Sequence, residues 1–127
     1  MEPDEIARFE SGAFPASQFS HGEHVRFGRM FLETTDFAEA LRRFSGGLKL
    51  IAQNAGKSDI YNETITTAFL SLIAEAMLAT PGLTYDGFCR VNPHLLDPKA
   101  LSRFYSPGRL HSQSARATFL LPDLLRD

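Results

Sequence analysis

The sequence predicts an all-α fold, a compact bundle of about five or six helices. Apolar residues recur at helical spacing along most of the chain. Capping residues and prolines divide it into helix-length segments, and no convincing β-hairpin signal is present. Its 127 residues, 43% hydrophobic and 22% charged, suit one globular unit, so residues 1–127 are expected to form a single domain.

The first expected helix spans His21 to about Thr35. Ser20 and Glu23 form a capping box, and Phe19 and His24 take the two positions of a hydrophobic staple. The predicted inner face carries His24, Phe27 and Phe31, with His21 as a further candidate, whereas Glu23, Arg26, Arg29 and Glu33 are expected in solvent.

The second expected helix opens at Thr35 or Asp36 and stops at Gly56. Gly46 and Gly47 in its middle each cost about 1 kcal/mol relative to alanine. The helix is therefore either interrupted there or approached closely by another backbone, and we favour the close approach.

The most apolar segment, Tyr61 to Ala79, predicts a central helix that is buried on several sides. In the last third, Thr84 caps a short helix, and Asp97 with Pro98 opens another through K-A-L-S-R-F-Y. Ser106-Pro107 repeats that device, and a final short helix is expected around residues 113–119.

Charge and composition exclude several classes of function. Lys and Arg number 13 against 15 Asp and Glu, a formal charge of -2, so a nucleic acid partner is not expected. No stretch approaches the ~20 apolar residues that cross a bilayer, so no membrane partner is expected. The single cysteine, Cys89, and a start without the pattern of a signal peptide lead us to expect a cytoplasmic protein.

The pair His21-x-x-His24 is the first chemical feature. Residues three apart share one side of a helix, so both imidazoles can face a common metal ion or substrate atom. A third ligand would be Glu63, because helical bundles build metal sites from His and carboxylate groups on facing helices. The alternative is that His21 lies in an exposed first turn and His24 only serves the staple.

The second feature is Asn62-Glu63, at the start of the most apolar helix. Both residues suit simple capping, since Asn62 can accept backbone N–H groups and Glu63 complements the positive helix end. Alternatively, Glu63 turns inward, where apolar surroundings or a metal ion would fit it for acid/base catalysis.

The third feature is the C-terminal segment, whose Tyr105, Arg109 and Arg116 offer groups for a polar ligand. The favoured interpretation is a strap across the bundle, with Arg116 paired to Glu63 or Asp97, and such a strap could also close a pocket. The remaining candidates are expected to be structural: His94 and His111 on the surface and Cys89 in the core. Common nucleophile, phosphate and dinucleotide motifs are missing from the sequence.

Four motifs in order, S-H-G-E-H-V-R, Y-N-E-T-I-T, N-P-H-L-L-D and Y-S-P-G-R-L-H-S-Q-S-A-R, resemble a family of small, uncharacterised bacterial helical proteins. The resemblance covers most of the chain. In that family the third helix begins Y-H-E-T, which implies a site of His21, His24, position 62 and Glu63. Asn62 departs from this pattern and removes one strong ligand.

The leading hypothesis is a pocket lined by His21, His24, Asn62 and Glu63, which binds a divalent metal ion or a small polar molecule. Glu63 or His24 would be the general base of an enzyme, although the sequence names no reaction. Tyr105 and Arg116 are further ligand-binding candidates. The alternative is a non-catalytic helical module for protein interaction or homodimerisation, because 11 phenylalanines favour exposed aromatic surface.

Overall fold

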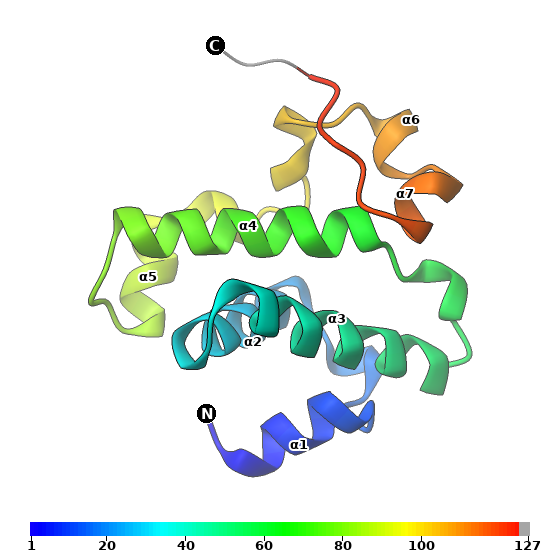
Figure 1. The fold of residues 1–127 in the computed structure, drawn as a ribbon. Coiled ribbons are helices and arrows are strands. Elements are labelled where there is room, and N and C mark those ends of the chain that lie inside the picture. The colour runs from blue at the N-terminus through cyan, green and yellow to red at the C-terminus, as the bar shows by residue number, and fades with distance from the viewer. Residues whose placement is uncertain (125–127) are drawn as a thin grey trace. The chain divides into compact units, whose positions relative to one another are not determined.

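The all-α class is confirmed by the computed structural model, which describes residues 1–124. These residues form seven α-helices, five of them of seven residues or more, and no strand (Figure 1). The helices are α1 (Pro3–Ser11), α2 (His21–Thr34), α3 (Phe37–Asn54), α4 (Glu63–Ala79), α5 (Tyr85–Val91), α6 (Pro107–Leu110) and α7 (Gln113–Ala117). Short 3₁₀ helices occupy Ala16–Gln18 (η1), Ser58–Ile60 (η2), Pro93–Leu96 (η3) and Ala100–Arg103 (η4). Across residues 1–124, every helix is too short or too polar to span a membrane.

The chain divides into two compact units, Met1–Tyr61 and Asn62–Asp127. In the first unit, α1 and α2 both pack against α3. In the second unit, α4 contacts α7 and η4, and α5 contacts η3. The expectation of a single domain stays a prediction.

Helix starts follow the predicted caps closely. The Ser20 hydroxyl accepts the Glu23 N–H at 3.4 Å, and α2 begins at His21. The Asp36 carboxylate accepts the Glu39 N–H at 2.8 Å at the start of α3. Each of these oxygens satisfies a backbone donor that the first helical turn leaves without an intrahelical partner.

The K-A-L-S-R-F-Y segment is where the helix prediction was wrong. Its regular part is the 3₁₀ helix η4, and the Asp97 carboxylate accepts the Lys99 N–H at 2.9 Å. This bond closes a local turn two residues on, so Asp97 does not cap an α-helix that starts at Pro98. The final helix α7 also ends at Ala117, before the expected end at residue 119.

Helix α1 was not predicted, although it supplies the centre of the aromatic cluster in the first unit. Pro3 occupies its first position, and Gly12 ends it with φ 79°. Its Phe9 is fully buried, with ring centroids 4.5 Å from Phe27 and 5.4 Å from Phe31. Phe9 also lies 5.9 Å from Phe44, so its ring joins residues of α1, α2 and α3.

The polar face of α2 is less solvated than its sequence pattern suggests. The Arg26 guanidinium bonds Glu5 of α1 and Glu23 of α2, and it lies 5.1 Å from the Phe27 ring. The Arg29 side chain is only 12% exposed, which contradicts its predicted position in solvent. Long cationic side chains bury their stems against apolar neighbours in this way.

Gly47 permits the close approach that the sequence predicted, and α3 runs without interruption. A Cβ atom at Gly47 would lie 2.9 Å from the carbonyl oxygen of Phe9 and 2.5 Å from its ring Cδ1. A Cβ atom at Gly46 would meet nothing within 4 Å. Only the second glycine of the pair is therefore required by packing.

We expect Gly47→Ala to lower the free energy of unfolding by about 1–3 kcal/mol, because the new methyl group must displace Phe9. The matched variant Gly46→Ala should raise it by up to about 1 kcal/mol through helix propensity alone. Urea unfolding followed by circular dichroism measures both. Equal effects of the two variants would contradict the close packing of α1 on Gly47.

Candidate functional site

The histidine pair lies at the start of α2, as the sequence predicted. The ring centroids of His21 and His24 are 6.0 Å apart. The His24 ring also meets Phe19 edge-on at 4.7 Å and lies 6.3 Å from Phe44. The contact with Phe19 is the expected staple, so His24 belongs to the aromatic cluster of the first unit.

Burial lowers the pKa of His24 to about 4, opposed by a hydrogen bond to the Ser20 carbonyl and reinforced by nearby His21. The His24 Nδ1 atom lies 3.3 Å from the Ser20 carbonyl oxygen. Because a carbonyl oxygen only accepts, this bond places the proton of the neutral ring on Nδ1. A general base works best with a pKa near the operating pH, so these surroundings do not favour His24 in that role.

The predicted third ligand, Glu63, is the first residue of α4 and belongs to the second unit. Within residues 1–124, no group of three or more His, Cys, Asp or Glu side chains is placed to hold a metal ion. The structure therefore offers no support for the ligand set of His21, His24 and Glu63, which stays a prediction.

Asn62 is buried, and both the oxygen and the nitrogen of its side chain make structural hydrogen bonds. Its Oδ1 atom accepts the Ile65 N–H at 2.8 Å and caps α4. Its Nδ2 group donates to the Leu110 carbonyl at 2.9 Å, which ties the end of α6 to the start of α4. The capping interpretation of Asn62 accounts for the first contact, and the second gives this side chain a further structural role.

The C-terminal segment 118–124 forms the expected strap, which is bonded to the start of α4 and to residues 105–109. The Thr64 hydroxyl donates to the Thr118 carbonyl at 2.7 Å and accepts the Leu120 N–H at 3.0 Å. Thr64 is fully buried in the first turn of α4. The Thr64 side chain therefore bonds two backbone groups of a segment that has no neighbouring strand to bond them.

Groups of residues 105–109 bond the same segment between Leu120 and Asp123. The Tyr105 hydroxyl donates to the Leu120 carbonyl at 2.7 Å, and Arg109 Nε donates to the Leu121 carbonyl at 2.8 Å. Asp123 accepts the Ser106 N–H at 2.8 Å. Burial raises the pKa of Tyr105, which keeps its hydroxyl protonated as a donor.

The remaining candidates take positions on or near the surface. Arg116 is exposed, and its guanidinium lies 3.5 Å from the His111 carbonyl oxygen. His94 and His111 are exposed as expected. Cys89 is only partly buried, which differs from its predicted core position.

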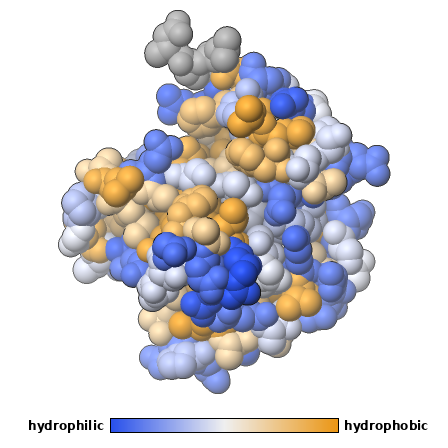
Figure 2. Space-filling view, viewed as in Figure 1, coloured by the Kyte–Doolittle hydropathy of each residue, from blue (hydrophilic) through white to orange (hydrophobic). Residues whose placement is uncertain are grey.

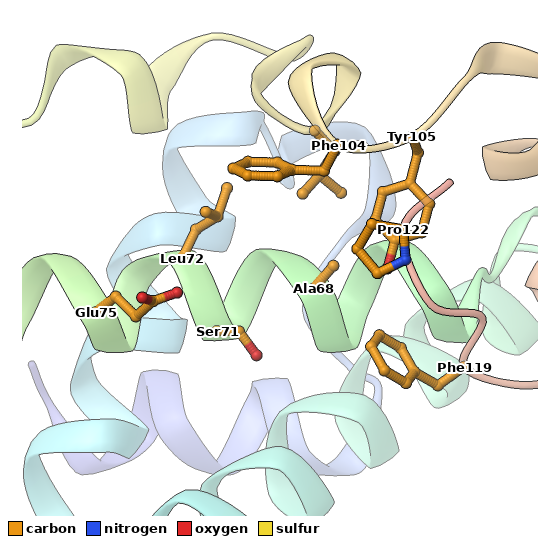
Figure 3. Close-up of a pocket in the computed structure, with 9 residues that line it drawn as sticks. Ala68, Ser71, Leu72, Glu75, Phe104, Tyr105, Phe119 and Pro122 are labelled. Carbon is orange, nitrogen blue, oxygen red and sulfur yellow. The ribbon is translucent and has the colours of Figure 1, made fainter. Parts of the chain in front are cut away.

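A small pocket lies between α4, the residues around η4 and the strap (Figure 3). Its volume is about 150 Å³. It is lined by Ala68, Ser71, Leu72, Glu75, Leu101, Phe104, Tyr105, Phe119 and Pro122. Most of these side chains are apolar, and Ser71 and Glu75 are the polar residues on its α4 wall. The Ser71 hydroxyl donates to the Thr67 carbonyl at 3.0 Å, so toward a ligand it can only accept.

Sequence reasoning selected Tyr105 but missed the other residues of this pocket. Ala68, Ser71 and Glu75 recur at helical spacing and so form one stripe of α4, in which two small side chains are followed by a carboxylate. That stripe was the available signal. The strap residues Phe119 and Pro122 could not be matched to it, because their distance from α4 is set by tertiary contacts.

The first prediction from this site concerns His24. Its unfolded pKa is near the ordinary 6.5, whereas the folded value is about 4. The unfolded ring therefore takes up a proton between these pH values that the folded ring does not, and stability falls as the pH drops through this window, by at most about 3 kcal/mol. Urea unfolding at pH 7, 5.5 and 4.5 measures the loss.

The variant His24→Phe should lose this part of the pH dependence, and His21→Gln should keep most of it. Carboxylates titrate in both variants, so the comparison isolates the buried ring. An unchanged pH dependence in His24→Phe would show that the ring of His24 is accessible to protons in the folded state.

The second prediction concerns Asn62. We expect Asn62→Ala to lower the free energy of unfolding by about 1–3 kcal/mol, because both the helix cap and the bond to Leu110 are lost. Asn62→Ser keeps a capping oxygen and should recover about 1 kcal/mol of this loss. Urea unfolding distinguishes them, and wild-type stability of the alanine variant would contradict a structural role.

Comparison with known proteins found no matching family model, no matching curated protein and no matching solved structure. The resemblance to small bacterial helical proteins therefore stays a prediction from the four sequence motifs.

Proposed function

We propose that this protein binds a small, mainly apolar molecule in the pocket beside α4. The observation that carries the proposal is an apolar cavity of about 150 Å³ with a serine and a glutamate on one wall. Ligand sites are typically apolar clefts with a few polar groups that orient the ligand. A cavity of roughly this volume accommodates a single benzene-sized ring.

One wall of the pocket is held in place without a ligand. Its strap wall, Phe119 and Pro122, belongs to the segment whose backbone is bonded by Thr64, Tyr105 and Arg109. A wall that is already ordered does not have to lose conformational freedom on binding, which favours affinity. The hydrogen bonds that hold the strap thus also fix one wall of the pocket.

This proposal changes the roles expected for several residues. Tyr105 contributes its ring to the pocket wall, because its hydroxyl is engaged by Leu120. Asn62 and Arg116 do not line this pocket. The proposal needs no resident metal ion and assigns no catalytic residue.

A protein-interaction or homodimerisation module is the second candidate function. It is favoured by exposed apolar side chains in both units, among them Ile60 at 62%, Leu78 at 83% and Leu121 at 68% exposure. Figure 2 shows apolar residues at the surface on the face in view. Sedimentation distinguishes this candidate, since a dimer that Leu78→Ser dissolves would favour it over a monomeric binding protein.

A bacterial, cytoplasmic setting is part of the proposal. The single cysteine, Cys89, is a free thiol and is only partly buried. Such a thiol persists most readily in the reducing environment of the cytoplasm.

The test of binding uses 2-phenylethanol, a neutral molecule with one aromatic ring. We expect a Kd of about 1 mM, which corresponds to roughly -4 kcal/mol. In two-dimensional NMR titrations, the amide signals of Ser71, Phe104 and Phe119 should shift together and saturate.

The blocking variant is Ser71→Leu, whose side chain would fill the cavity and should weaken binding at least about tenfold. The matched control is Ser102→Leu, an exposed serine in η4 outside the pocket lining, which should leave the Kd unchanged. Shifts that are scattered over the chain, or that do not saturate, would refute the pocket.

A further inference from the structure

We propose that the natural ligand of this pocket is a compact arylalkylamine, with the ammonium group held by Glu75. This inference rests on the proposed function and adds the charge of the ligand to it. It is drawn from the position of Glu75 at the edge of an apolar pocket, as seen in Figure 3.

The position of Glu75 follows from the helix. Ser71 and Glu75 are four residues apart on α4, and such residues are neighbours on a helix surface, about 6 Å apart along its axis. A ring packed beside Ser71 therefore has Glu75 one turn further along α4. A chain of about two carbon atoms spans that distance, which defines the size of the amine.

Glu75 also differs from several other glutamates in its ion pairing. The carboxylates of Glu5, Glu10 and Glu39 each bond to an arginine, whereas Glu75 takes part in no ion pair within residues 1–124. The Glu75 carboxylate is therefore available to pair with a ligand ammonium group. A ligand carboxylate in the same place would be repelled.

The other pocket residues favour an organic cation over a metal ion. Metal sites in proteins need several oxygen, nitrogen or sulfur ligands, and the pocket lining offers one carboxylate and one serine hydroxyl on α4. Its apolar walls and the rings of Phe104 and Phe119 match an aromatic ligand body instead.

The experiment compares 2-phenylethylamine with the nearly isosteric neutral 2-phenylethanol and with 3-phenylpropionate, by NMR titration at low ionic strength. Glu75 is exposed, so its charge pair is partly screened, and we expect the amine to bind roughly two- to fivefold more tightly than the alcohol. The carboxylate should bind more weakly than the alcohol. In Glu75→Gln the three affinities should converge.

The matched control is Asp86→Asn, which changes the net charge equally at an exposed residue of α5 outside the pocket lining. It should keep the order of the three affinities. If the alcohol binds in the pocket but the amine binds no better, the amine inference is overturned and the proposed function stands.

An amine preference that survives in Glu75→Gln would also overturn the inference, because the aromatic rings alone would then hold the cation. Failure of all three probes to bind would refute the proposed function itself. The experiment therefore tests the preference for a charged ligand separately from binding in the pocket.

Discussion

The second unit depends on satisfying the backbone of an extended segment that belongs to no sheet or helix. Most of residues 118–124 are exposed and the others are half-buried, so burial of apolar side chains does little to hold the segment. Hydrogen bonds, each worth a net 0.5–1.5 kcal/mol, hold it instead. Side chains of Thr64, Tyr105 and Arg109 bond four of these groups. Because the same segment forms one wall of the pocket, the shape of the pocket follows from these bonds.

The first unit depends on a different constraint, the approach of α1 to α3 at Gly47. This approach places Phe9 among the rings of α2 and α3, and His24 lies at the edge of the same cluster. An imidazole in such surroundings loses solvation and stays neutral. The property that makes His24 look like a functional residue is therefore explained by its packing.

The fold was more predictable from sequence than the site. Caps at Ser20, Asp36 and Thr84 are local signals, because the side chain and the N–H that it accepts are three residues apart. The capping role of Asn62 was predictable for the same reason, but its second role was not. Its bond to Leu110 spans 48 residues and could not be deduced from spacing. Helix α1 had its own signals in Pro3 and Gly12, but its importance depends on a tertiary contact.

The strap also limits the size of any ligand in the pocket. A molecule with two rings that placed both of them beneath the strap would have to move Phe119 and Pro122 outwards. This movement would strain the bonds that Thr64, Tyr105 and Arg109 make to the segment. At a net 0.5–1.5 kcal/mol for each bond, breaking three of them would cost roughly 3 kcal/mol, or about a hundredfold in affinity. The hydrogen bonds that order the strap thus oppose any ligand that has to displace it, without any direct contact between their donors and that ligand.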